Sequence, residues 1–193
     1  MKYSMKYIAE SIDILASISP SDIERIVDEV SVVKSNGGRL FCIGVGGGAS
    51  TASHAVNDFR KIDGIEAYSP VDNVAELTAN INDYGWDYSF RNWLIESKLC
   101  SKDCVFVFSV GGGSSFLKVS ENIVCALDHA QYLKTKIVGI VGRDGGYTAE
   151  VADACIIIPT VHDRRITPHT ESMQTLLLHL IVNHPRICGV IDE

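Results

Sequence analysis

Apolar side chains recur at helical spacing through the first part of the chain. One set consists of Ile8, Ile12, Leu15 and Ile18, and a second of Ile23, Ile26, Val27, Val30 and Val33. Residues at such spacing lie on one face of a helix, so the pattern predicts two amphipathic helices within residues 1–36. Between them, Ser19-Pro20-Ser21-Asp22 is typical of a helix end followed by a new start. Glu24, placed after Ser21 as in a capping box, supports that start.

The rest of the chain alternates unbroken apolar runs with helical patterns. The runs predict buried strands at residues 39–45, near 66–70, and at 103–109, 136–141 and 154–158. The predicted helices run from the first glycine turn to about Lys61, from Val74 into Trp86, from the second glycine turn through about Tyr132, and from near Pro168 to His184. Strands that alternate with helices imply a parallel sheet covered on both faces. We expect one domain, 1–193, with a helical pair at 1–36 and an α/β core at 37–193.

Two similar glycine turns follow two of the predicted strands. They span residues 45–50, Val-Gly-Gly-Gly-Ala-Ser, and residues 110–115, Val-Gly-Gly-Gly-Ser-Ser. A glycine run between a strand and a helix leaves backbone N–H groups free at a helix N-terminus, where the partial positive charge favours an anion such as phosphate. Ligands of parallel sheets bind at the carboxyl ends of the strands. The turns therefore predict a ligand site built from two loops.

The first turn also fits a second interpretation. Gly44, Gly46 and Ala49 match the dinucleotide fingerprint GxGxxG/A, and Glu66 or Asp72 could supply its acidic residue. That interpretation leaves the second glycine turn unexplained. A nucleoside triphosphatase is disfavoured because no Walker lysine follows either turn.

Charge and composition narrow the class of protein. The net charge of −7 argues against a nucleic-acid surface. The one basic cluster, Arg164-Arg165, is either part of a solvated loop or a contact for a small anion. The apolar runs are too short to span a membrane, and we expect no membrane association. Six cysteines without a CxxC pair indicate a reduced, cytoplasmic protein.

Two pairs of histidine and carboxylate residues are candidates for chemistry. His54 and Asp58 lie on one face of the helix after the first glycine turn. Glu171 and His179 are about 80° apart around the last long helix. Two histidines and two carboxylates from two helices could hold zinc or transfer a proton. Alternatively, each pair makes only structural hydrogen bonds, and Glu171 only complements the helix dipole.

Five ordered segments resemble the sugar isomerase (SIS) domain superfamily and, within it, the phosphoheptose isomerase family. They are residues 44–54 (GVGGGASTASH), 82–86 (NDYGW), 109–114 (SVGGGS), 142–146 (GRDGG) and 170–179 (TESMQTLLLH). The resemblance implies a flavodoxin-like five-stranded parallel sheet preceded by two helices. It also implies a homotetramer with active sites between subunits.

The same resemblance implies a reaction and its residues. One zinc ion per active site would be held by His54, Asp58, Glu171 and His179. Sedoheptulose 7-phosphate would be converted to D-glycero-D-manno-heptose 7-phosphate through an enediol or enediolate, for bacterial surface heptose in lipopolysaccharide or capsule. Asp58 would act as the base and His179 as its acid/base partner.

Residues expected to bind the substrate lie mostly in the glycine turns. They are Gly46, Gly47, Gly48, Ser50, Asp83, Ser109, Gly111, Gly112, Ser114, Ser115 and Glu171. Arg164, Arg165, His169 and Gln174 are further candidates for lining the site.

The chain departs from the family pattern at several of these positions. Asp58 replaces a glutamate and Glu171 a glutamine, and the turns carry fewer hydroxyls, with Gly48 in place of a serine and Val110-Gly111 in place of Thr-Ser. A catalytically silent SIS-fold protein that binds a sugar phosphate or acts as a scaffold is therefore the alternative to the enzyme.

Overall fold

The computed structural model describes residues 2–190 and contains one parallel sheet. Its strand order is β2-β1-β3-β4-β5, the flavodoxin-like order. The strands are β1 (Leu40–Gly44), β2 (Ala67–Tyr68), β3 (Cys104–Ser109), β4 (Lys136–Val141) and β5 (Ala154–Ile157). All neighbouring pairs are parallel, and β1 and β3 pair from Leu40 opposite Cys104 to Gly44 opposite Phe108. The predicted fold is confirmed.

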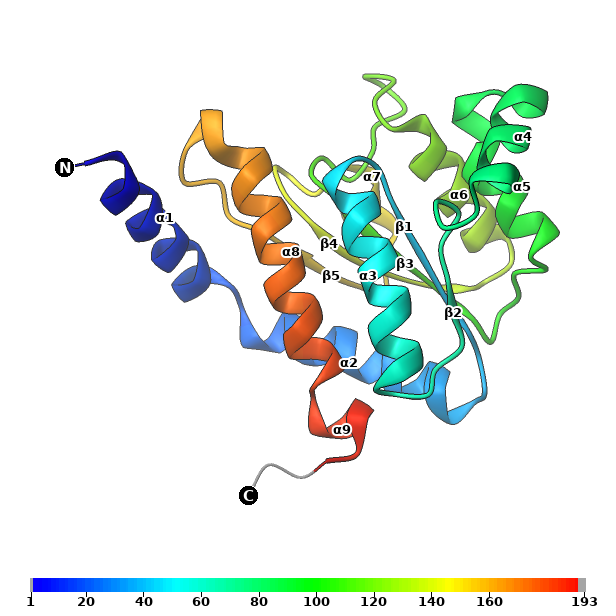
Figure 1. Cartoon of the computed structure of the whole chain (residues 1–193), viewed down its shortest axis with the longest axis horizontal. Helices are drawn as coiled ribbons and strands as arrows, with labels where there is room; N and C mark the ends of the chain where they lie inside the picture. The colour runs from blue at the N-terminus through cyan, green and yellow to red at the C-terminus, as the bar shows by residue number, and fades with distance from the viewer. Residues whose placement is uncertain (1, 191–193) are drawn as a thin grey trace.

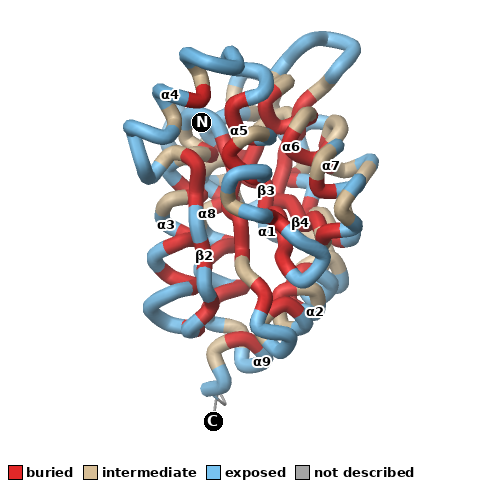
Figure 2. The backbone as a smooth tube through the Cα atoms, turned by 90° about the vertical axis from the view of Figure 1, so that its right-hand side faces the viewer, coloured by how far each residue is buried: buried red, intermediate tan, exposed pale blue. Residues whose placement is uncertain are grey.

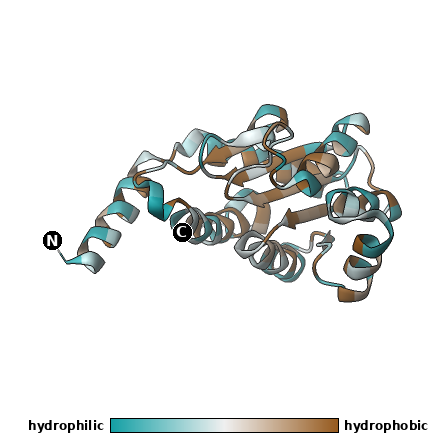
Figure 3. Cartoon of the chain, turned by 90° about the horizontal axis from the view of Figure 1, so that it is seen from above, coloured by the Kyte–Doolittle hydropathy of each residue, from teal (hydrophilic) through white to brown (hydrophobic). Residues whose placement is uncertain are grey.

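Helices cover both faces of the sheet (Figures 1 and 3). One face packs against α2 (Pro20–Ser35), α3 (Gly47–Lys61) and α8 (Ile166–Val182). The other packs against α4 (Val74–Tyr84), α5 (Trp86–Glu96), α6 (Glu121–Tyr132) and α7 (Gly146–Val151). Successive strand residues point to opposite faces, so β3 is buried along its whole length (Figure 2).

The junction between the first two helices differs from the predicted capping box. Helix α1 (Tyr3–Ser17) is followed by α2, which already begins at Pro20, with Ser19 at the N-cap position. A proline at the first helical position is favourable because its missing N–H would have no partner there. Ser21 is therefore inside the first turn, and the capping box predicted from Ser21 and Glu24 is wrong. Glu24 instead pairs with Arg186, which follows the start of α9 (Pro185–Cys188).

The predicted apolar face of α1 is largely uncovered. Ile8 is 60% exposed and Ile12 59% exposed, and Leu15 is exposed as well. Within α1 only Glu10 and Ile14 are buried. The helix projects from the body of the molecule (Figure 1). The periodicity was thus a correct sign of a helix, although most of its apolar face does not pack on the described part of the same chain.

A partly buried ion pair holds α1 to the beginning of α8. Both carboxylate oxygens of Glu10 accept hydrogen bonds from the Arg165 guanidinium, at 2.6 Å each. His169 Nε2 lies 3.1 Å from the same carboxylate, and its ring packs on Tyr7. Arg165 lowers the pKa of Glu10 to about 2. Arg165 and His169, which we considered for the substrate site, are therefore occupied by Glu10.

Other differences from the predicted elements are confined to loops and short helices. Helices α5, α7 and α9 were not predicted. The helix expected directly after the second glycine turn begins only at Glu121, because a loop intervenes, closed by a bridge between Ser114 and Val119. Phe116 in that loop is 93% exposed. The second glycine turn therefore does not lie at the N-terminus of a long helix, contrary to the expectation.

Two further properties concern the whole described chain. No helix within residues 2–190 combines the length and apolar character needed to cross a bilayer. The six cysteines are free thiols, and Cys42 and Cys104 are buried in the strands. Burial raises the pKa of both thiols, so they behave as small apolar side chains.

A buried carboxylate without a hydrogen-bond partner lies just after α3. Asp63 is 5% exposed, and neither of its carboxylate oxygens makes a hydrogen bond within residues 2–190. Burial raises its pKa from 3.8 to about 6, with Lys34 opposing the shift. The folded protein thus binds this proton more tightly than the unfolded chain does, and folding stability falls as the pH rises through this interval.

We expect Asp63→Asn to stabilise the protein at pH 7.5 by up to about 3 kcal/mol, because the buried charge is removed. The gain should shrink as the pH is lowered through 6 towards 3, where the wild-type carboxyl is mostly protonated in both states. Denaturant unfolding of both proteins at several pH values measures the difference. A gain that does not change with pH would contradict this explanation.

Candidate active site

The first glycine turn brings α3 close to the sheet. Gly46 adopts φ +62°, which glycine tolerates and which turns the chain from β1 into the helix. A Cβ on Gly48 would lie 2.2 Å from the carbonyl oxygen of Phe108 at the end of β3. Only a residue without a side chain allows this approach. Helix α3 is therefore held directly over the carboxyl edge of β1 and β3.

Helices α3 and α8 pack against one another and run in the same direction. Glu171, early in α8, lies against Gly47 at the start of α3, whereas His179 lies beside Asp58, further along both helices. The beginnings of both helices therefore meet at the first glycine turn. Further along, both helices carry the residues of a cluster of two histidines and a carboxylate. All four residues of the expected zinc site come from these two helices.

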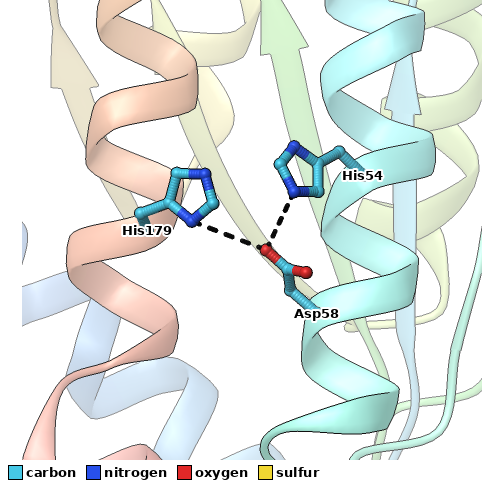
Figure 4. Close-up of side chains that lie close together, drawn as sticks. All are labelled: His54, Asp58 and His179. Atoms are coloured by element: carbon cyan, nitrogen blue, oxygen red, sulfur yellow. Dashed lines mark ion pairs between the residues drawn. The ribbon is translucent and has the colours of Figure 1, made fainter.

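Three of those residues form a compact cluster (Figure 4). Asp58 Oδ2 lies 3.2 Å from His54 Nε2 and 3.6 Å from His179 Nδ1. The two imidazole rings meet edge to face with centroids 4.9 Å apart. Asp58 is only 6% exposed, while the side chains of His54 and His179 are 41% and 49% exposed. The carboxylate is thus buried between two rings that face solvent.

The cluster fits a divalent metal ion. Oδ2 of Asp58 is buried and makes no hydrogen bond within residues 2–190. One ligand atom from each of His54, Asp58 and His179 lies within 4.8 Å of the others. Two imidazoles and a carboxylate form the donor set of several catalytic zinc sites, in which a fourth position remains for water or substrate. The other oxygen, Oδ1, accepts a hydrogen bond from Asn57 Nδ2 at 2.9 Å, which orients the carboxylate.

Glu171 is not part of this cluster. A Cβ on Gly47 would lie 2.3 Å from Cδ of Glu171 and 2.5 Å from each carboxylate oxygen. The carboxylate therefore sits against the N-terminus of α3, where the helix dipole favours a negative charge. Its role as a fourth metal ligand stays a prediction.

Several predicted substrate-binding residues lie at the carboxyl edge of the sheet, but some are already used within the turns. Ser109 Oγ accepts a hydrogen bond from the Gly112 amide at 3.0 Å, and Ser114 Oγ accepts one from Leu117 at 3.2 Å. Ser50 and Ser115 are exposed. The predicted anion contacts at Gly46, Gly48 and Gly111 remain predictions.

Two other candidates have different surroundings. Gln174 is fully buried, and its side-chain amide donates to the carbonyl oxygen of Ile140 at 2.8 Å, so it holds α8 to β4. Asp83 is exposed in α4 and accepts a hydrogen bond from the side chain of Asn82. The side chains of Gln174 and Asp83 therefore make hydrogen bonds within the protein, and their roles at the substrate site remain predictions.

Two residues near the site, Arg143 and Asn57, were not among the candidates predicted from the sequence. Arg143 follows β4 directly, and its side chain lies across Gly111 of the second glycine turn. A basic residue just after a buried strand, within the quoted segment 142–146, was the available signal. Asn57 could not be singled out, since only the structure shows that its amide holds Asp58.

The fold is shared with other proteins of known structure. The sugar isomerase domain of the RpiR transcription factor from Sphaerobacter thermophilus superposes with a TM-score of 0.60 at 16% identity, covering 98% of this chain and 95% of that one. Phosphoheptose isomerase from Neisseria gonorrhoeae gives a TM-score of 0.79 at 23% identity, covering 93% and 95%. The chain therefore has the fold of a sugar isomerase (SIS) domain.

Sequence similarity identifies the family. No protein-family model matches the chain. A probable phosphoheptose isomerase of Thermoplasma volcanium is 30% identical over 92% of this chain and 84% of its own length. Phosphoheptose isomerase of Aneurinibacillus thermoaerophilus is 27% identical over 99% and 93%. The chain belongs to the phosphoheptose isomerase family.

Adjacent glycines in α3 provide a matched test of the helix contacts. We expect Gly48→Ala to destabilise the protein by about 1–3 kcal/mol, because its methyl group would overlap a backbone carbonyl that cannot move freely. Gly47→Ala should change stability by less than about 1 kcal/mol, since the flexible end of Glu171 can move aside. Both changes improve helix propensity equally. Equal unfolding midpoints for the two variants would show that the Phe108 contact does not limit this position.

Proposed function

We propose that the protein is a zinc-dependent aldose-ketose isomerase that converts sedoheptulose 7-phosphate to D-glycero-D-manno-heptose 7-phosphate. The observation that carries this proposal is the cluster of His54, Asp58 and His179 between α3 and α8. Family membership supports a sugar phosphate as the substrate. The departures of the glycine turns from the family pattern leave the cluster itself in place.

The proposed reaction moves one proton between two carbons of the sugar. Asp58 removes the proton from C1 of the ketose, and the electrons of that C–H bond form the C1–C2 double bond of the enediol(ate). Return of the proton to C2 and loss of the C1 hydroxyl proton give the aldose. His179, next to Asp58, exchanges protons with the hydroxyl oxygens.

A bound zinc ion would polarise the substrate carbonyl and stabilise negative charge on oxygen. His54, Asp58 and His179 would hold it, and we keep Glu171 as the fourth proposed ligand, which requires its side chain to turn from Gly47 towards the cluster. Asp58 is one methylene shorter than the glutamate usual in the family. Its position between both imidazoles supports the proposal that the shorter side chain still reaches the site.

We expect Asp58→Asn and His179→Ala to lower kcat on sedoheptulose 7-phosphate by at least about 100-fold, because each removes a proton-transfer group. Metal analysis should find about one zinc per chain in the wild type and a loss in His54→Ala and His179→Ala. The control is His129→Ala, which removes a histidine from α6, on the opposite face of the sheet. Full turnover in Asp58→Asn would overturn the mechanism. Sugar-phosphate binding by wild type without any turnover would instead favour the catalytically silent protein.

We also propose that the protein assembles as a homotetramer with active sites between subunits. The exposed apolar side chains of α1 support this part of the proposal, since a second copy could cover them. The six free thiols are consistent with a cytoplasmic location. The proposed product would supply heptose for a bacterial lipopolysaccharide or capsule.

We expect the double substitution Ile8→Glu, Ile12→Glu to break the assembly into smaller species, because charges would be buried in an apolar contact. Light scattering coupled to size-exclusion chromatography measures the mass. Ser17→Glu is the control, since it adds a charge at an exposed position elsewhere on the same helix. An unchanged mass for the double variant would place the subunit contact away from this face.

A further inference from the structure

The two glycine turns lie at neighbouring strand ends but carry side chains of opposite charge. The first turn is in contact with the carboxylate of Glu171, which lies against Gly47. The structure shows no ion pair to Glu171 from any cation within residues 2–190. The N-terminus of α3 is therefore already complemented by a negative charge of the protein itself.

The second turn is in contact with a cation. A Cβ on Gly111 would lie 3.6 Å from Cδ and 3.7 Å from Nε of Arg143, so the arginine side chain lies across the turn. Arg143 makes no ion pair with the carboxylates of the described chain, and its side chain is exposed. Its guanidinium is thus available for an anion, which it can bind with two parallel hydrogen bonds.

The backbone near this arginine also contains amide groups without a partner. Arg143 adopts φ +54°, a left-handed conformation that costs energy for a residue with a side chain. The amide N–H groups of Gly111 and Gly113 make no hydrogen bond within residues 2–190, and Gly111 lies beside the arginine side chain. Gly112 is instead fixed by its contact with Gly145, which joins the second turn to the loop that carries Arg143.

We propose that Arg143 is a further substrate-binding residue, which holds the phosphate of the sugar at the second glycine turn, and that Glu171, while its side chain lies against Gly47, excludes the phosphate from the first. This inference rests on the proposed function for the identity of the ligand. The opposite charges give the substrate one orientation, with its phosphate at Arg143 and its uncharged carbonyl end towards α3 and α8.

Inorganic phosphate is the probe for the charge at the second turn. We expect Arg143→Gln to weaken phosphate binding roughly 10-fold in calorimetry of the zinc-free protein, because a charged hydrogen bond is lost. Arg143→Lys, which keeps the charge but loses the bidentate geometry, should lie between this variant and wild type. With sedoheptulose 7-phosphate, Arg143→Gln should raise KM by a similar factor and leave kcat within about twofold.

Lys134→Ala is the matched control. Lys134 is also basic and has φ +56°, but it precedes β4, whereas Arg143 follows that strand at its other end. Its removal changes the net charge equally without touching the second turn. We expect wild-type phosphate affinity and KM. If Arg143→Gln and Lys134→Ala changed phosphate affinity and KM equally, the proposal would be overturned. The effect would then come from the net charge of the protein and not from a contact at the second turn.

Glu171→Gln should act in the opposite direction. It removes the negative charge from the first turn, so phosphate should bind several-fold more tightly to the zinc-free variant than to wild type. Unchanged phosphate affinity would overturn the role of Glu171 as an anion barrier. Loss of zinc in this variant with no change in phosphate affinity would leave Glu171 with the metal role alone and overturn its role at the first turn.

The binding measurement also separates this inference from the proposed reaction. If wild type shows no turnover but Arg143→Gln still weakens phosphate binding, the isomerase function fails and the anion site stands. If wild type turns over and Arg143→Gln has wild-type KM and phosphate affinity, the isomerase function stands and the inference fails.

Discussion

The seating of two helices on glycines at the strand ends is the constraint on which the rest of the site depends. Gly48 lets α3 approach the carbonyl oxygen of Phe108, and Gly142 does the same for α8, since a Cβ there would lie 2.4 Å from Thr170 Oγ1. These contacts fix both helices over the same edge of the sheet. The separation of Asp58 from His179 follows from them, because neither helix can rise from the sheet without losing its contact.

The polar cluster itself contributes little to holding these helices together. His54 and His179 are about half exposed, and ion pairs at such positions add little to stability. The apolar side chains of α3 and α8, such as Phe59 and Leu178, are fully buried against the sheet and provide the larger stabilisation. The buried Asp58 is therefore held by the surrounding core, and its oxygen without a hydrogen bond remains available to a metal or a proton.

Sequence periodicity predicted the sheet well because each central strand is buried on both faces and contains an unbroken apolar run. It failed where local rules compete, as at Ser19-Pro20-Ser21, where proline placed the helix start earlier than the capping pattern did. The three residues of the cluster could be predicted from the sequence, as members of two histidine–carboxylate pairs on two helices. The direction of the Glu171 side chain could not, since it depends on the distance between α3 and α8, which no local pattern encodes.

The ion pair of Glu10 with Arg165 connects the exposed part of the molecule to this site. A partly buried ion pair is a weak source of stability, but breaking it leaves one charge poorly solvated, so the two helices are held in the arrangement that keeps both partners together. Here it fixes the angle at which α1 projects, and through His169 it fixes the beginning of α8. Glu171 follows two residues later and His179 two turns further along the same helix. Helix α8 is therefore attached to α1 at its beginning and carries His179 of the polar cluster further along. A subunit contact that moved α1 would for this reason also shift the position of the site.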